Sequence, residues 1–139
     1  MQISKVMHAP AEWVEATTPV VEVARRMKDG DIGALPVGRN DRLVGMITDR
    51  DLALRVLGEG RDPGKTTAED VMSPGIVWCL TSQMVEDAMH MMEQKKIRRL
   101  PVIDEKKRLV GMLSLGDIAD AMPRQLLGEV VNAVADHHA

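Results

Sequence analysis

The chain has 139 residues and a formal net charge of −3, from 18 Lys and Arg against 21 Asp and Glu. This length holds one compact domain or two small interdependent halves, and 45% apolar with 28% charged residues is ordinary for a folded globular protein. The negative charge gives no general attraction for nucleic acid, and two Trp with no Tyr or Phe leave few platforms for stacking bases. We therefore expect no nucleic acid partner.

The first half of the chain predicts a strand, a helix, two strands and a second helix. A short strand at 13–15 precedes apolar residues at helical spacing, which are Val20, Val23, Ala24 and Met27. Two strands at 34–38 and 43–47 flank a polar turn, and a helix follows at 49–57. Residues 58–65, with three Gly and one Pro, predict a linker.

The second half predicts the same order of elements. Thr67 and Asp70 form a capping signal before a strand at 76–80, and apolar residues at helical spacing follow from Val85 to Met92. Strands are expected at 99–104 and 109–113, and a helix at 115–122. The tail, 123–139, predicts a separate helix with one apolar stripe, made of Leu126, Leu127, Val130, Val131 and Val134.

The two halves are copies of one unit. A shift of 65 residues places Trp13 on Trp78 and Leu35-Pro36-Val37 on Leu100-Pro101-Val102, and after one extra turn residue a shift of 66 places Asp51 on Asp117. The copies are residues 1–57 and 66–122, in an α/β (α+β) fold of two βαββα repeats. A repeat of about 55 residues buries little surface alone, so we expect the two to pack around a pseudo-twofold axis with ligands in clefts between them.

The most specific motif is Gly-x-x-(Thr/Ser)-x-x-Asp, which occurs at 45–51 and again at 111–117. Each copy lies where a strand is expected to run into a helix. Thr48 and Ser114 are natural N-caps with an Asp three residues on, so the motif has a purely structural interpretation as a capping box. The same Asp is also suited to accept hydrogen bonds from two adjacent hydroxyls, such as a ribose diol. The occurrence of the motif in both copies favours a binding role.

On these residues, the chain resembles a pair of cystathionine β-synthase (CBS) domains, a Bateman module. The resemblance covers Val6 to Met122, and in particular it points to small stand-alone bacterial CBS-pair proteins, whose first repeat often contains the Asp-Ile-Gly-Ala-Leu-Pro and Thr-Asp-Arg-Asp sequences seen at 31–36 and 48–51. Members of the family commonly bind AMP, ADP, ATP, S-adenosylmethionine or NAD in two clefts between the repeats. The resemblance therefore implies an adenosine-containing ligand.

The resemblance also implies which residues would bind that ligand. Asp117 would accept the ribose hydroxyls with Ser114 as its hydroxyl neighbour, and Asp51 with Thr48 would do the same in the other cleft. The segments before Leu-Pro would contact adenine or phosphate, and these are Ile32, Gly33 and Ala34 in the first copy and Ile97, Arg98 and Arg99 in the second.

The two sites are not equivalent in charge. Arg98 and Arg99 carry guanidinium groups suited to phosphate, so the Asp117 cleft is expected to be the better phosphate site, whereas Arg50 supplies charge to the other. The alternative for Arg98 and Arg99 is a solvated helix end favoured by the helix dipole.

No catalytic or metal site is expected. The sequence holds no nucleophile with its base and no paired acid and base, and the glycines at 58–64 have neither P-loop nor dinucleotide-binding spacing. His90 is out of phase with Met89 and Met92, which predicts an exposed histidine beside a packed Met stripe, and Cys79 is expected to be a buried, inert thiol.

The leading hypothesis is a regulatory sensor of an adenosine-containing nucleotide that signals by conformational change to a separate effector protein, as a homodimer in the cytoplasm. A single cysteine and the absence of a signal-peptide or membrane-spanning apolar run favour that compartment and no membrane contact. The alternative is a non-sensing, homo-oligomeric interaction module whose motif residues only cap helices.

Overall fold

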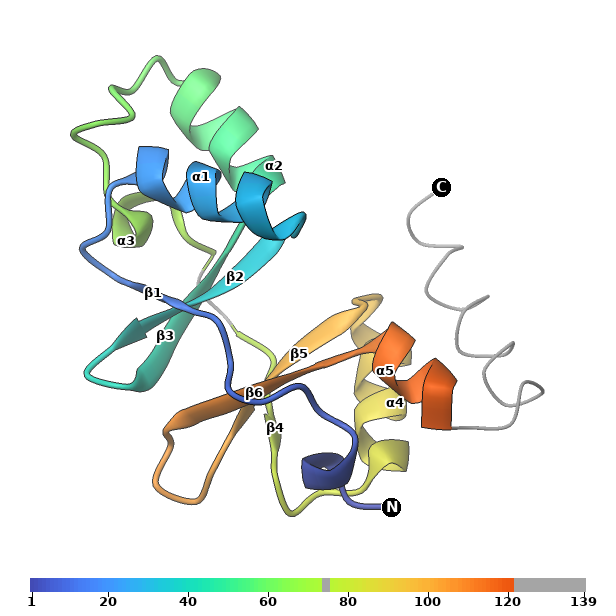
Figure 1. Cartoon of the computed structure of the whole chain (residues 1–139). Helices are drawn as coiled ribbons and strands as arrows, with labels where there is room; N and C mark the ends of the chain where they lie inside the picture. The colour runs from blue at the N-terminus through green and yellow to red at the C-terminus, as the bar shows by residue number, and fades with distance from the viewer. Residues whose placement is uncertain (74–75, 122–139) are drawn as a thin grey trace. The chain divides into compact units, whose positions relative to one another are not determined.

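The computed structural model of the chain describes residues 1–73 and 76–121, which contain two three-stranded sheets with helices beside each (Figure 1). The contacts divide the chain into two units. Residues 12–76 form the first-repeat unit, and residues 1–11 with the chain from Val77 onward form the second-repeat unit. The expected α/β fold of two similar repeats is confirmed. The predicted C-terminal helix at 123–139 lies outside the described residues.

The first-repeat unit has the sheet order β1-β2-β3, with β1 parallel to β2 and β2 antiparallel to β3. Its strands are β1 (Val14–Glu15), β2 (Ala34–Arg39) and β3 (Arg42–Thr48). Its helical segments are α1 (Val20–Gly30), α2 (Asp49–Asp51), the π-helical η2 (Leu52–Leu57) that continues α2, and α3 (Ala68–Val71). The helix predicted at 49–57 is therefore present, but its second part is wound as a π-helix.

The second-repeat unit repeats this arrangement with the sheet order β4-β5-β6. Its strands are β4 (Cys79–Leu80), β5 (Arg99–Ile103) and β6 (Leu109–Ser114), and its helices are α4 (Val85–Lys95) and α5 (Leu115–Ala121). A 3-10 turn, η1 (Ile3–Lys5), precedes the first strand of the chain and was not predicted. The strands predicted at 13–15 and 76–80 are both shorter in the structure, two residues each.

Local irregularities recur at matching positions of the two copies. Helices α1 and α4 each end at a left-handed residue, Asp31 with φ 51° and Lys96 with φ 56°. The hairpin register shifts after Val37 in one copy and after Val102 in the other. Each of these pairs is separated by the same 65 residues as the sequence repeat, so the repeat extends to the backbone conformation.

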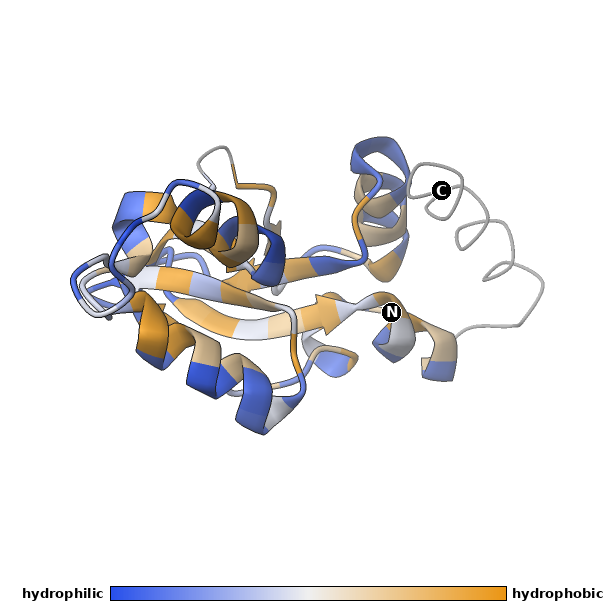
Figure 2. Cartoon of the chain, turned by 90° about the horizontal axis from the view of Figure 1, so that it is seen from above, coloured by the Kyte–Doolittle hydropathy of each residue, from blue (hydrophilic) through white to orange (hydrophobic). Residues whose placement is uncertain are grey.

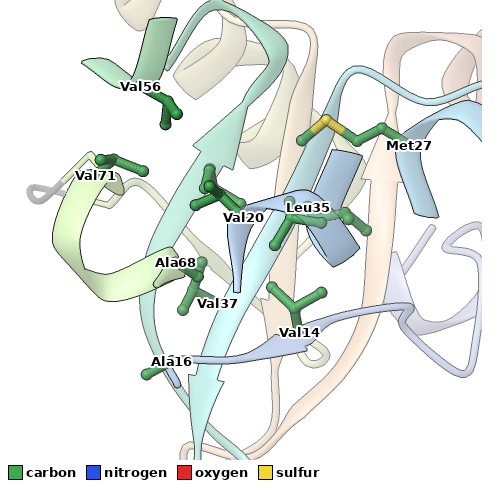
Figure 3. Packing of buried hydrophobic residues seen from close by; sticks show 11 residues of the cluster. Val14, Ala16, Val20, Met27, Leu35, Val37, Val56, Ala68 and Val71 are labelled. Atoms are coloured by element: carbon green, nitrogen blue, oxygen red, sulfur yellow. The ribbon is translucent and has the colours of Figure 1, made fainter. Parts of the chain in front are cut away.

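Each unit has its own apolar core. In the first-repeat unit, side chains of α1, η2 and α3 pack against β1, β2 and β3, as Figure 3 shows for Val20, Val56, Val71 and Leu35. The helices are orange on one side and blue on the other in Figure 2, in keeping with one buried face each. One predicted core residue is wrong: Ala24 is exposed, because the buried face of α1 is narrow and runs through Val20, Val23 and Met27.

The leading segment of each copy packs in the unit of the other copy. Ile3 is fully buried in the core of the second-repeat unit, where its backbone N–H donates to Gln83. Helix α3, at the start of the second copy, packs in the first-repeat unit through Ala68 and Val71. The boundaries of the two structural units therefore differ from those of the sequence repeats, 1–57 and 66–122, because each leading segment belongs to the other unit.

Within residues 1–73 and 76–121, no helix is long and apolar enough to cross a membrane.

Candidate functional site

The first Gly-x-x-(Thr/Ser)-x-x-Asp motif lies where β3 ends and α2 begins. Thr48 is the N-cap of α2, and its hydroxyl oxygen accepts a hydrogen bond from the Asp51 backbone N–H at 3.1 Å. The Asp51 Oδ2 atom accepts in return from the Thr48 backbone N–H at 2.9 Å, which completes a capping box. Asp51 is 8% exposed, so a buried carboxylate is fixed at this end of the sheet.

The second motif has the same geometry at the junction of β6 and α5. The Asp117 N–H donates to the Ser114 hydroxyl oxygen at 3.1 Å, and the Ser114 N–H donates to Asp117 Oδ2 at 2.9 Å. Asp117 is 9% exposed. A capping box is therefore present in both copies, and it uses one carboxylate oxygen, Oδ2.

The other carboxylate oxygen of each motif contacts the leading segment of the opposite copy. The His8 Nε2 atom lies 2.8 Å from Asp117 Oδ1. The Ser73 hydroxyl donates to Asp51 Oδ1 at 3.2 Å, and the Arg55 Nε atom is 3.9 Å from the same oxygen. Neither His8 nor Ser73 was among the predicted site residues.

The motif glycines allow this close approach. A Cβ atom on Gly111 would lie 2.7 Å from the His8 carbonyl oxygen and 2.7 Å from the Met7 sulfur, and one on Gly45 would collide with the Met72 sulfur. The crossing backbone therefore requires glycine at 111, whereas at 45 the close neighbour is the flexible Met72 side chain. Backbone hydrogen bonds to Met112 and Met46, each next to its motif glycine, hold residues 8 and 73 near the carboxylates.

The segments before Leu-Pro, which the resemblance assigns to adenine or phosphate, lie beside the motifs. Ala34 pairs with Thr48 across β2 and β3, and Arg99 pairs with Ser114 across β5 and β6. The carbonyl oxygens of Gly33 and Arg98 accept the backbone N–H groups of Asp49 at 2.9 Å and Leu115 at 2.8 Å. Ile32 and Ile97 are half-buried and pack against the cores of their units, so their side chains contribute to packing.

The charges beside the two motifs differ. Arg98 and Arg99 are exposed, and neither guanidinium group forms a hydrogen bond or an ion pair with any residue of the described chain. In the first copy, the Asp49 Oδ2 atom would lie 3.0 Å from a Cβ on Gly33, the counterpart of Arg98, and Asp49 Oδ1 accepts from the Arg50 backbone N–H at 2.8 Å. The Arg50 side chain is exposed. The second motif therefore has cationic groups where the first has an additional carboxylate.

Two other predictions concern residues away from the motifs. Cys79 is fully buried, and burial raises the pKa of its thiol to about 12, which agrees with an inert thiol. His90 is exposed on α4 while Met92 is buried and Met89 packs against the core, as the helical phase indicated. Within the described ranges, no group of three or more His, Cys, Asp or Glu residues could hold a metal ion.

Comparison with known proteins identifies the family. The model of the CBS domain matches this chain twice, over residues 3–58 and 68–124, and together these matches cover most of its length. The chain therefore belongs to the CBS domain family and carries a tandem pair of CBS domains, as the repeat and its two motifs indicated.

Several relatives are themselves small CBS-pair proteins. The CBS domain-containing protein YhcV of Bacillus subtilis is 40% identical over 117 residues, which are 84% of this chain and 82% of YhcV. Hypoxic response protein 1 of Mycobacterium tuberculosis is 35% identical over 130 residues, 93% of this chain and 90% of that protein. A crystal structure of Hypoxic Response Protein I with two coordinated zinc ions has a TM-score of 0.81 at 35% identity, covering 88% of this chain and 100% of that one.

A second solved structure contains a nucleotide. It is that of CBSX2 in complex with AMP, with a TM-score of 0.74 and 28% identity over 86% of this chain and 94% of that chain. The first structure contains zinc, but the described residues of this chain provide no comparable ligand set. His8 and Asp117 are close enough to share a metal ion, yet they supply only two ligands, whereas structural zinc takes four.

Proposed function

We propose that this chain is a regulatory module that binds an adenosine-containing nucleotide at its two motif carboxylates, Asp51 and Asp117. The observation that carries the proposal is the division of labour between the oxygens of each Asp. One oxygen closes a capping box and thereby fixes the carboxylate. The other oxygen, Oδ1, contacts a side chain of a crossing segment, His8 or Ser73, and in Asp51 it also lies 3.9 Å from Arg55 Nε. A fixed carboxylate with spare acceptor capacity fits the two adjacent hydroxyls of a ribose.

The neighbouring residues support the same ligand class. Backbone groups at 32–34 and 97–99 lie next to the motifs through the hairpin register, which suits contacts to adenine or phosphate. The unpaired guanidinium groups of Arg98 and Arg99 favour a phosphorylated ligand at the second motif. CBSX2, which shares the fold at 28% identity, binds AMP. AMP, ADP, ATP, S-adenosylmethionine and NAD are therefore the candidate ligands.

Binding is proposed to regulate and not to catalyse. A ligand that binds one arrangement of the module increases the population of that arrangement. At a hundredfold excess over Kd, the free energy of that arrangement falls by about 2.7 kcal/mol relative to one that does not bind. We propose that the signal passes to a separate effector protein or through a homodimer, and that the module acts in the cytoplasm, where a free thiol such as Cys79 stays reduced.

An exposed apolar surface on η2 supports the proposal of a homodimer. Leu54 and Leu57 of η2 are 53% and 75% exposed, an apolar pair that a partner surface would cover. Sedimentation equilibrium of the purified chain tests this part: we expect twice the chain mass of 15.3 kDa. A monomer at micromolar concentration would leave signalling to an effector protein alone.

The ligand is tested by thermal unfolding with each of the five candidates at millimolar concentration. We expect one of them to raise the melting temperature of the wild type by several degrees, and Asp117→Asn to reduce that shift. Asparagine keeps one acceptor oxygen for the Ser114 N–H, so the cap is retained while the second carboxylate oxygen is lost.

The matched control is Asp70→Asn. Asp70 caps α3 by accepting the Thr67 N–H at 2.8 Å, in the same kind of capping box but outside the 45–51 and 111–117 motifs. This variant should leave every ligand-induced shift unchanged. If no candidate shifts the wild type, while Asp117→Ala still costs the 0.5–2 kcal/mol typical of a lost cap, the motif is structural and the alternative of a non-sensing interaction module holds.

A further inference from the structure

The two motif carboxylates have different partners at equivalent positions. His8 and Ser73 each follow a Val-Met pair, and the 65-residue shift of the repeat places one on the other. His8 Nε2 lies 2.8 Å from Asp117 Oδ1, whereas the Ser73 hydroxyl lies 3.2 Å from Asp51 Oδ1 and 3.4 Å from Asp51 Oδ2. An imidazole therefore occupies in the second motif the place that a hydroxyl occupies in the first.

The backbone holds both residues at these places. The N–H and carbonyl groups of His8 bond to those of Met112 at 2.8 and 2.9 Å, and those of Ser73 bond to Met46 at 2.8 and 3.4 Å. The two partners of the His8–Asp117 contact differ in their freedom to move, because the His8 side chain is 80% exposed and the Asp117 side chain only 7%. The imidazole can turn into solvent while the carboxylate stays fixed by its capping box.

The two partners also differ in chemistry. A hydroxyl both donates and accepts, so Ser73 can bond to Asp51 and to a ligand hydroxyl at the same time. An imidazole on Asp117 occupies one acceptor position of Oδ1 and offers no hydroxyl to the ligand, and when protonated it also neutralises the carboxylate that would bind the ribose. A ribose hydroxyl at Asp117 therefore competes with the imidazole for Oδ1, whereas one at Asp51 can join the existing hydrogen bond.

We propose that His8 is an internal competitor for Asp117, and that the identity of the residue after Val-Met sets the ligand affinity of each motif. The proposal rests on the proposed function and deepens it, because it makes His8 a competitor of the ligand at the second motif. At the first motif the crossing segment supplies the Ser73 hydroxyl instead, and the cationic Arg55 side chain lies farther from Asp51 Oδ1, at 3.9 Å.

The test exchanges the two residues. AMP, ATP and S-adenosylmethionine, which share one ribose diol, are titrated calorimetrically into His8→Ser in an Asp51→Asn background, so that the second motif is read alone. We expect the affinity to rise about two- to fivefold over the same background with His8, the range for giving up one solvent-exposed charge-assisted hydrogen bond. His90→Ser, which removes an exposed histidine from α4, should change nothing.

The reciprocal variant reads the first motif. In an Asp117→Asn background, Ser73→His should lower the affinity by a similar factor. An unchanged or weaker affinity of His8→Ser would overturn the proposal, because His8 would then be a bystander or a ligand contact. If the wild type and all variants fail to bind any of the three compounds, the proposed function fails together with this inference; binding by the wild type without an effect of His8 overturns the inference alone.

A measurement on the wild type keeps the proposal testable even if an exchange variant unfolds. The imidazole proton resonances of His8 are assigned by their loss in His8→Asn. Adding AMP to the wild type should move them in the same direction as Asp117→Asn does in the free protein, because both release the imidazole. Resonances that respond to neither change would contradict the contact.

Discussion

Asp51 and Asp117 each use two oxygens for two purposes. Burying a carboxylate is costly unless it is hydrogen-bonded, and both residues meet this condition through their own capping boxes. The second oxygen is satisfied by His8 or Ser73, side chains that lie at the surface or near it. A carboxylate that is held rigidly on one side and bonded to an exchangeable partner on the other is prepared to bind a ligand without rearranging the helix.

Cys79 is the residue whose protonation the fold alters most clearly. Burial raises the pKa of its thiol to about 12, above the ordinary value of 9.0. Iodoacetamide at pH 8 should therefore leave the native protein unlabelled and label it fully in denaturing urea, as mass spectrometry would show. Equal labelling rates in both conditions would mean that the thiol is accessible.

The same shift fixes a dependence of stability on pH. Because the folded pKa lies above the unfolded one, the unfolded chain loses the thiol proton first, and the free energy of unfolding should fall as the pH rises above about 9. Cys79→Ala should lack this part of the alkaline loss, although it will be less stable at every pH because it leaves a small cavity.

At the scale of elements, each sheet is crossed by the leading segment of the other copy, and a glycine makes room for it. Gly111→Ala should destabilise the protein by about 1–3 kcal/mol, because the new Cβ would press on the His8 carbonyl and the Met7 sulfur. Urea unfolding measures this difference. Gly64→Ala is the control, since a Cβ there would meet only Asp62 Oδ1 at an ordinary 3.5 Å; an equal loss in both variants would contradict the account.

The helices and strands were predictable because their signals are local. The apolar spacing of Val20, Val23 and Met27 places α1, and the apolar run from Leu35 to Val37 before a polar turn places β2. The π-helical winding of η2 was not predictable, since residues 52–57 carry an ordinary helical pattern. The short η1 turn was missed because it is stabilised by packing of Ile3 against residues some eighty positions away.

The candidate site was predictable in part for the same reason. Thr48, Asp51, Ser114 and Asp117 stand out because the motif is continuous in sequence and occurs twice. His8 and Ser73 do not, because their approach to the carboxylates depends on crossing segments from the opposite copy. Two features of the sequence could have pointed to them. Both residues directly follow a Val-Met pair at matching positions of the repeat, and each motif has a glycine inside a strand, where no turn requires one.

At the scale of the whole molecule, two copies of one CBS fold carry two motifs of equal backbone geometry and unequal surroundings. The capping boxes agree to within 0.1 Å between the copies, whereas the side chain at Oδ1 and the charges beside the motif differ. The two copies therefore share one scaffold, and their two candidate sites differ in the groups around the carboxylate. We propose that the module responds to one nucleotide at two sites with different affinities.

The central claim is that the motif carboxylates bind an adenosine-containing nucleotide. The most direct measurement is calorimetric titration of AMP, ATP and S-adenosylmethionine into the wild type and into the double variant Asp51→Asn/Asp117→Asn, with both proteins shown to unfold cooperatively at similar temperatures. The account predicts saturable binding of at least one of these compounds by the wild type and its loss in the double variant. Binding that survives both substitutions, or a wild type that binds none of the three, would contradict it.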